Sequence, residues 1–196
     1  MPENIDEIEI TIFDTETTGL KPEEGDRMVE LAALKVRAKE RIAVFDELIN
    51  PGRAISAGAF SVNKITPEML KGVPEIGAVM PKFLDFTKGS CLCSYNAEFD
   101  MSFLNNELKL IGLPAINNIL VLDVLTMARK LLPGLARYPL WFVAQKLEIR
   151  TVQQHRALAD VEMTWEVFTK LKALCQEKGI ADLASFSNLF AFKPKI

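Results

Sequence analysis

The chain has 196 residues, of which 49% are hydrophobic and 25% charged, and its net charge is −3. This composition is typical of one globular domain, and the acidic balance argues against a broadly basic surface that grips nucleic acid. No apolar run approaches the roughly 20 residues of a membrane span, and the acidic N-terminus does not resemble a signal peptide. Three cysteines do not make a disulfide framework in a chain of this size, which favours the reducing cytoplasm.

The first third of the chain predicts three strands and a short helix. Residues 8–13 alternate acidic and apolar side chains and then turn apolar, which indicates the first strand. The apolar runs 28–36 and 42–49 are separated by a charged turn, so the three strands are expected to form an antiparallel meander. The segment TPEMLKG, residues 66–72, predicts a helix with Thr66 as its N-cap.

The rest of the chain alternates helices and strands. The predicted elements are a helix over 74–89, a strand over 90–96, a helix over 97–112, a strand over 118–122, and helices over 123–134, 138–149 and from about Ala157 onward. This order predicts an α/β protein with a mixed central sheet, an antiparallel meander followed by parallel strands, and helices on its faces. Five apolar residues near the C-terminus are expected to be buried, against the domain or against a partner: Leu183, Phe186, Leu189, Phe190 and Phe192.

Two carboxylates stand one residue apart in the stretch DTETTGL, residues 14–20. In a strand, side chains at i and i+2 share a face, so Asp14 and Glu16 are expected to point the same way. Two like charges this close disfavour ionisation unless a cation lies between them. The alternative is a solvated strand end that precedes a turn at Gly19.

Two further carboxylates and the single histidine occur in later segments. Asp100 lies in NAEFD, in the first turn of a predicted helix, and Asp160 follows His155 near the start of the last strong helix. Each has a structural alternative, since first-turn acids are stabilised by the helix dipole and a lone histidine is usually a surface or core residue. Together, four hard oxygen donors favour a pair of Mg²⁺ or Mn²⁺ ions about 3.5–4 Å apart. His155 is then placed to take a proton from the attacking water near neutral pH.

The stretches DTETTGL, NAEFD and HRALAD, in this order, resemble the three motifs of the DEDDh exonuclease family, which includes proofreading subunits of bacterial DNA polymerases. The resemblance runs from about residue 8 to 175 and implies an RNase H-like fold with two-metal hydrolysis of DNA or RNA from the 3′ end. Nucleoside monophosphates are the implied product. By position, it implies metal binding by Asp14, Glu16, Asp100 and Asp160, and a general base at His155.

The same resemblance implies a pocket for the 3′-terminal nucleotide. Thr17, Gly19 and Leu20 match the turn that holds this nucleotide, and Asn96 and Phe99 match positions that line the pocket around it. Core packing is the alternative for Leu20 and Phe99. Single-stranded or frayed 3′ ends are the implied ligands, and a DNA polymerase is an implied partner.

One position departs from the family pattern, and the length of the resemblance gives the expected domain boundaries. Many members have histidine where this chain has Tyr95, which leaves the catalytic positions intact but bears on how the pocket receives the nucleotide. We expect one exonuclease domain over 1–196, with a catalytic core of about 8–175 and a short C-terminal extension over 176–196.

Three alternatives are weaker. Cys91 and Cys93 with His155 offer zinc ligands, but C-x-C is not a usual structural-zinc spacing. The basic residues Arg129, Lys130 and Arg137 are candidates for phosphate contacts, although a solvated helix face accounts for them as well. A non-catalytic nucleic-acid-binding or polymerase-adaptor domain of the same fold is expected to have lost a metal carboxylate or the histidine, whereas this chain retains all five.

Overall fold

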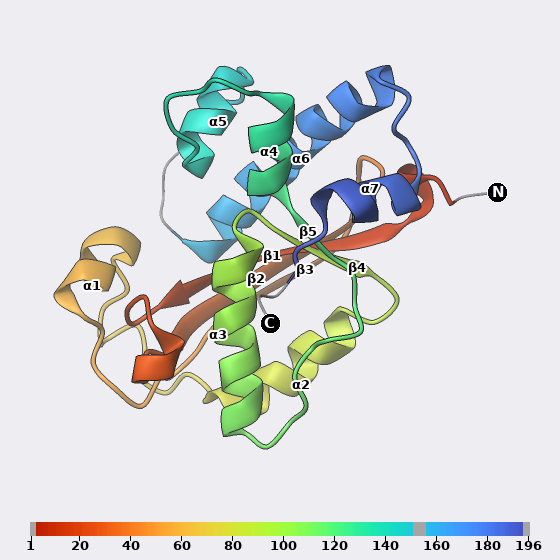
Figure 1. Ribbon diagram of the computed structural model, residues 1–196. Helices are drawn as coiled ribbons and strands as arrows, with labels where there is room; N and C mark the ends of the chain where they lie inside the picture. The colour runs from red at the N-terminus through yellow and green to blue at the C-terminus, as the bar shows by residue number, and fades with distance from the viewer. Residues whose placement is uncertain (1–2, 151–155, 194–196) are drawn as a thin grey trace.

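The computed structural model describes residues 3–150 and 156–193, and its centre is a five-stranded mixed sheet (Figure 1). The strands are β1 (Glu9–Thr17), β2 (Met28–Arg37), β3 (Glu40–Leu48), β4 (Cys91–Ser94) and β5 (Val121–Asp123). They lie in the order β3-β2-β1-β4-β5, with β1, β2 and β3 antiparallel and β4 and β5 parallel to β1. The predicted mixed sheet is therefore confirmed.

Helices cover both faces of this sheet, with α4, α5, α6 and α7 on one face and α2 and α3 on the other (Figure 1). The α-helices are α1 (Ala57–Asn63), α2 (Ile76–Phe86), α3 (Ala97–Leu110), α4 (Val124–Leu131), α5 (Leu140–Lys146), α6 (Ala157–Glu177) and α7 (Leu183–Phe190). Two short 3-10 helices, η1 (Ile5–Glu7) and η2 (Pro22–Glu24), flank β1. Each face of the sheet thus has its own buried apolar cluster.

Strand β1 lies at the centre of the sheet and contributes to both clusters. Ile10 and Ile12 pack toward α6, whereas Phe13 packs toward α2 and α3 on the opposite face. The strand continues to Thr17, four residues beyond its predicted end, because its backbone stays paired with β2 after the apolar run has stopped. Asp14 and Glu16 are consequently strand residues and share the face of Ile10 and Ile12.

The predicted helix over residues 66–72 is wrong. The segment forms successive turns in which Met69 donates its N–H to the Thr66 carbonyl at 3.1 Å, and no residue between 66 and 72 is buried. A turn of this length has too few hydrogen bonds to nucleate a helix and no apolar face to stabilise one. A helix that was not predicted, α1, precedes it and begins at Ser56, whose side chain accepts the Ala59 N–H at 3.1 Å.

The other predicted elements are present with shifted ends, and the C-terminal apolar residues pack on the domain. Helix α7, which was not predicted as a helix, buries Phe186 and Phe190 in the cluster beside α4 and β5. Phe192 donates its N–H to the Val121 carbonyl at 2.8 Å, so the chain returns to the edge of the sheet. Within the described ranges, no helix is both long and apolar enough to cross a membrane.

Candidate active site

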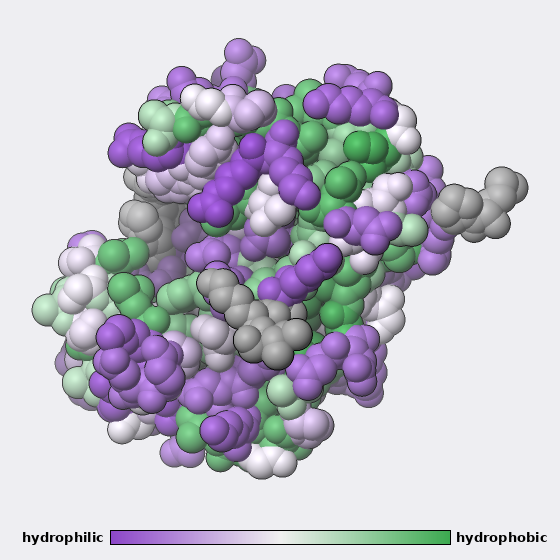
Figure 2. All heavy atoms as spheres, viewed as in Figure 1, coloured by the Kyte–Doolittle hydropathy of each residue, from purple (hydrophilic) through white to green (hydrophobic). Residues whose placement is uncertain are grey.

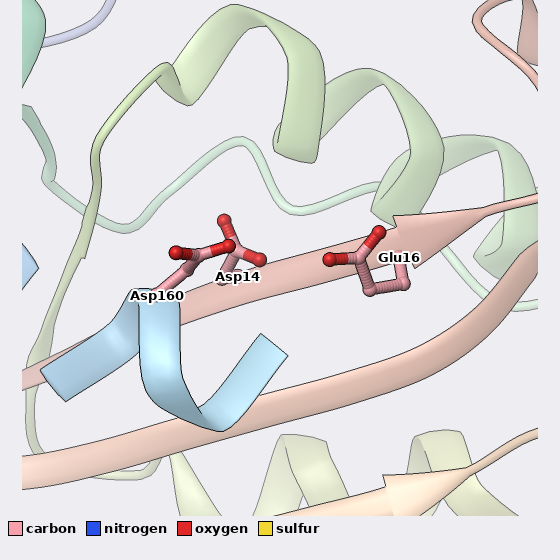
Figure 3. A group of neighbouring side chains, drawn as sticks. All are labelled: Asp14, Glu16 and Asp160. Atoms are coloured by element: carbon pink, nitrogen blue, oxygen red, sulfur yellow. The ribbon is translucent and has the colours of Figure 1, made fainter. Parts of the chain in front are cut away.

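Three carboxylates from two elements converge beside the C-terminal end of β1 (Figure 3). Asp14 and Glu16 project from β1, and Asp160 projects from the first turn of α6. One oxygen from each side chain lies within 4.8 Å of the others, and in the described parts of the chain these three residues are the group that could hold a metal ion. The predicted convergence of these carboxylates is found.

A buried glutamate on β2 fixes the start of α6. Glu30 is 1% exposed and stands opposite Glu16 in the β1–β2 pairing. Its carboxylate accepts the Ala157 N–H at 2.9 Å and the Arg156 Nε–H at 3.0 Å, and it forms an ion pair with the Arg156 guanidinium. Since Ala157 is the first residue of the helix and Asp160 lies in the same turn, this contact holds Asp160 beside β1.

Asp100 lies in the same pocket but outside the cluster of three. It is buried at the start of α3, where its Oδ1 accepts the Thr15 N–H at 3.1 Å and the Thr15 hydroxyl at 2.8 Å, while its Oδ2 accepts the Ser94 hydroxyl. Asp14, Asp100 and Asp160 line one pocket of about 200 Å³. The fold therefore places Asp100 next to Asp14, with its oxygens turned toward the ends of β1 and β4.

Burial and mutual repulsion oppose ionisation of these carboxylates. Burial raises the pKa of Asp14 well above its ordinary value, and the charges of Asp100 and Asp160 raise it further. Burial, followed by the charges of Asp160 and Glu30, raises the pKa of Glu16 to about 8. Burial also raises the pKa of Asp100 to about 6, although hydrogen bonds from Ser94 and Thr15 lower it. The site thus favours protons or cations.

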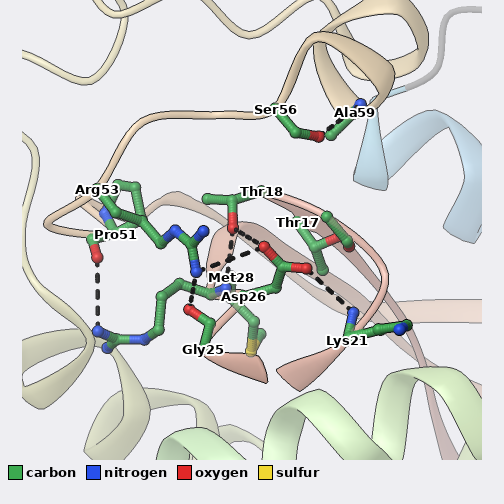
Figure 4. Close-up of polar contacts among 12 residues, drawn as sticks. Thr17, Thr18, Lys21, Gly25, Asp26, Met28, Pro51, Arg53, Ser56 and Ala59 are labelled. Atoms are coloured by element: carbon green, nitrogen blue, oxygen red, sulfur yellow. Dashed lines mark hydrogen bonds and ion pairs between the residues drawn. The ribbon is translucent and has the colours of Figure 1, made fainter. Parts of the chain in front are cut away.

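The turn after β1 lines a groove beside Glu16, and Figure 4 shows polar contacts that hold this turn. The Thr17 hydroxyl donates to the Gly19 carbonyl at 2.5 Å, and Asp26 accepts the Thr18 hydroxyl at 3.0 Å. A Cβ on Gly19 would lie 2.2 Å from an Asp26 oxygen, so a larger residue here would displace the Asp26 carboxylate from its hydrogen bonds to Thr18 and Lys21. Leu20 is 78% exposed, and core packing therefore does not account for it.

Helix α1 forms the other wall of this groove of about 590 Å³ and contributes a residue that the sequence did not reveal. Asn63 is 1% exposed; its amide donates to the Thr17 carbonyl at 3.2 Å, and its Oδ1 accepts the Ile65 N–H at 3.1 Å. A hydrogen bond from Asn63 also lowers the pKa of Glu16 against the larger effect of burial. A lone asparagine has no spacing pattern, so only the fold identifies it.

Asn96 and Phe99 lie where the groove and the acidic pocket meet. Phe99 lines both spaces and packs on Phe103 with ring centroids 5.0 Å apart. Asn96 is exposed at the start of α3 and lines the acidic pocket. Of the residues predicted for the nucleotide pocket, Thr17, Gly19 and Leu20 line the groove, Asn96 lines the acidic pocket, and Phe99 lines both.

Tyr95 is a buried structural residue of the same pocket. Its hydroxyl donates to the Tyr138 carbonyl at 2.5 Å, and burial raises the pKa of this phenol above its ordinary value. It therefore stays protonated and ties the start of α3 to the segment that leads into α5. His155, the predicted general base, lies outside the described residues.

The zinc alternative receives no support from the geometry. Cys93 is fully buried in the core, and burial raises the pKa of both Cys91 and Cys93, which disfavours the thiolates that zinc requires. Lys130 donates to the Leu189 carbonyl at 2.6 Å, whereas Arg129 and Arg137 are exposed.

Comparison with known proteins gives consistent matches. The model of the family RNase_T, described as Exonuclease, matches residues 11–168. The chain is 36% identical over 181 residues to DNA polymerase III PolC-type of Caldanaerobacter subterraneus, covering 92% of this chain but 13% of that protein. It is 39% identical over 168 residues to the DNA polymerase III subunit epsilon of Treponema pallidum, covering 85% of this chain and 77% of that one.

A solved structure shares the fold. Exonuclease X in complex with 5′ overhanging duplex DNA superposes with a TM-score of 0.70 at 24% identity, covering 92% of this chain and 98% of that one. This likeness confirms the RNase H-like fold. The chain spans 12–13% of the length of the PolC-type relatives.

Proposed function

Because this chain belongs to the exonuclease family RNase_T, we propose that it is a metal-dependent 3′–5′ exonuclease that releases nucleoside 5′-monophosphates from DNA or RNA. The observation that carries the proposal is the convergence of Asp14, Glu16 and Asp160 within 4.8 Å, with Asp100 in the same pocket. These residues come from β1, α3 and α6, which meet near the C-terminal end of β1. Such a placement is costly without a cation, which favours a functional role.

The donor set fits hard divalent cations. All four side chains are carboxylates, the ligands that Mg²⁺ and Mn²⁺ prefer, and their raised pKa values arise from burial and from one another's charge. We propose that Asp14, Glu16, Asp100 and Asp160 hold two such ions. When bound, these ions would stabilise the attacking and leaving oxygens of a phosphodiester displacement.

The protein's own residues would bind and orient the 3′ end. Thr17 and Gly19 line the groove, and the exposed side chain of Leu20 is placed to contact the terminal base. Phe99 would pack against the terminal sugar from the other side, and Asn96 would contact it at the entrance to the acidic pocket. His155 would accept the proton of the attacking water.

Partner and location follow from the relatives and the cysteines. The matched relatives are DNA polymerase III proteins, so we propose a DNA polymerase as partner. Three free cysteines support the cytoplasm as its compartment. A non-catalytic adaptor of the same fold is the second candidate, but the retention of all four carboxylates and His155 in the sequence disfavours it.

The test uses 5′-labelled single-stranded DNA and RNA of one sequence, incubated with Mg²⁺, with Mn²⁺ or with EDTA. We expect a ladder that shortens by one nucleotide at a time in either metal and no cleavage in EDTA or with Asp14→Ala. Asp85→Ala, which removes an exposed carboxylate on α2, should be fully active. The faster substrate identifies the nucleic acid. A labelled mononucleotide as the first product would reverse the polarity, and intact strands would favour the adaptor.

The role of His155 has its own prediction. His155→Ala should lower turnover by about 10²–10⁴-fold, the usual contribution of general-base catalysis. The increase in melting temperature on adding Mn²⁺ should persist, because His155 is proposed to move a proton and not to bind the ion. Loss of that increase in His155→Ala, while it remains in the wild type, would reassign His155 as a metal ligand.

A further inference from the structure

An aromatic residue that no motif contains lines the acidic pocket. Trp141 is the second residue of α5, it is half-buried, and it faces the same pocket of about 200 Å³ as Asp14, Asp100 and Asp160. Large aromatic side chains in the core are common, but this one is partly open beside the carboxylates. Core packing alone therefore does not explain a tryptophan at this position.

The backbone that carries Trp141 is held in place by contacts on both sides. The Tyr95 hydroxyl binds the Tyr138 carbonyl, and the Tyr138 hydroxyl donates to the Leu132 carbonyl at 2.8 Å. Val143, two residues further along α5, is fully buried in the cluster that includes α6. The indole therefore stands on a fixed element, at the same pocket that Asn96 and Phe99 line.

An arginine side chain lies over the Trp141 ring. The Arg137 guanidinium lies 4.5 Å from the centroid of the Trp141 ring and 5.1 Å from that of Phe142. The two aromatic rings meet edge to face, with centroids 5.7 Å apart. Because the guanidinium lies over one face of the Trp141 ring, a base would stack on the other face. Aromatic rings on which bases stack, together with basic side chains that follow the backbone, are a common means of binding single-stranded nucleic acid.

The charge around α4 and α5 supports the same ligand. Residues 124–150 contain five Lys or Arg against a single Glu, in a chain whose net charge is −3. Hydrophilic side chains lie over the α4 region on the face shown in Figure 2. A polyanion that approaches four carboxylates needs positive charge nearby, and Arg137, which lies over the Trp141 ring, is a basic residue that the structure places there.

We propose that Trp141 stacks a base of the single strand upstream of the 3′-terminal nucleotide, and that Arg137 contacts the adjacent phosphate. This inference rests on the proposed exonuclease activity and adds a second substrate contact to the terminal-nucleotide groove. The two spaces share Thr15 and Phe99, so a strand could pass from the groove to the indole without leaving the site.

The test compares a long and a minimal substrate. With a single-stranded 12-mer, in DNA and in RNA form, kcat/KM of Trp141→Ala should fall by about 5- to 150-fold, the range expected for one base stacked on an aromatic ring. With the p-nitrophenyl ester of thymidine 5′-monophosphate, which has no upstream base, kcat/KM should not change. Trp141→Phe, which keeps an aromatic ring, should retain most of the activity on the 12-mer and controls for misfolding.

The matched control is Trp165, which also has an arginine over its ring, Arg41 at 5.0 Å, but lies outside the two pockets. Trp165→Phe should keep wild-type kinetics on both substrates. These are the two tryptophans of the chain. Fluorescence of Trp165→Phe should therefore be quenched by the 12-mer, and that of Trp141→Phe should not.

The outcomes distinguish failure of the Trp141 stacking role from failure of the proposed exonuclease activity. An equal loss on both substrates, or no loss on the 12-mer, would overturn the stacking role of Trp141 while leaving the exonuclease in place. Wild-type protein that cleaves neither substrate would overturn the proposed function itself. Quenching of Trp165 to the same extent as Trp141 would also contradict the stacking role.

Discussion

At Asp14 and Glu16 the chain keeps carboxylates where burial and neighbouring charge both oppose ionisation. Without a metal ion, the protein avoids the cost of ionising these carboxylates by keeping them protonated. A divalent cation instead stabilises their ionised form by binding to it. The two ligands compete for the same oxygens. The protonation state of these residues therefore connects stability, metal affinity and pH.

The first prediction concerns this connection. The folded pKa of Glu16 is about 8 against an ordinary value of 4.5, so between these values the folded state binds more protons than the unfolded state. Stability of the metal-free protein should therefore fall as pH rises through this window. Melting temperatures in EDTA between about pH 5.5 and 8.5 measure the fall, and the increment from Mn²⁺ should grow with pH.

Glu16→Gln is the control for this pH dependence. It removes the titrating group, so its melting temperature in EDTA should change less with pH than that of the wild type. A wild-type stability that rises with pH in EDTA, or the same slope in both proteins, would contradict the assignment of the raised pKa to Glu16.

Among the elements, the start of α6 decides whether Asp160 reaches β1. The helix has no side-chain cap at Arg156; instead, Glu30 on β2 accepts the Ala157 N–H and pairs with Arg156. Glu30 is fully buried, but the Arg156 side chain is 38% exposed, so water can partly replace the lost partner. The energy of this contact is therefore expected to lie below that of a fully buried pair.

The second prediction tests this contact. Glu30→Gln should lower the free energy of unfolding by about 1–3 kcal/mol, because the buried charge-assisted hydrogen bonds are lost. It should also weaken Mn²⁺ binding, measured by calorimetry, since Asp160 lies in the same helical turn. Glu162→Gln removes the exposed ion pair of α6 with Arg41 and should cost less than about 1 kcal/mol. Equal effects of the two variants would contradict the proposal that Glu30 anchors the start of α6.

Elements with a strong apolar period were predictable, and those without one were not. The strands and long helices alternate or repeat their apolar residues, whereas β1 continues past Phe13 through polar residues that hydrophobicity does not mark. Helix α1 is short, and of its residues only Asn63 is buried. The carboxylates were found because three motifs contain them. Glu30, Asn63 and Trp141 are single residues that only the fold brings to the site.

Over the whole molecule, α7 completes the larger of the two apolar clusters. Phe186 is fully buried there, in the same cluster as Ile5 and Phe168. Two backbone hydrogen bonds join the ends of the described chain, from Ile5 N–H to the Ala181 carbonyl at 2.8 Å and from Leu183 N–H to the Glu3 carbonyl at 2.9 Å. The C-terminal helix is thus part of the folded core.

The third prediction concerns this helix. Phe186→Ala should lower the free energy of unfolding by about 3–5 kcal/mol, because it leaves a cavity in a close-packed cluster. Leu110→Ala, which truncates a side chain that is 56% exposed, should change it by less than about 0.5 kcal/mol. Urea unfolding measures both. A loss below about 1 kcal/mol for Phe186→Ala would mean that α7 is only loosely attached.

The pairing of residues 3–5 with residues 181–183 also bears on the order in which a ribosome completes this protein. Ile5 is synthesised well before the backbone partner of its N–H and the neighbouring aromatic cover, which arrive only with residues 181–190. The β1–β2–β3 meander can pair while synthesis continues, since its strands are consecutive. The segment of residues 3–5 instead waits until residues 181–183 have been synthesised, so a ribosome stalled before residue 181 would present it uncovered to chaperones and proteases.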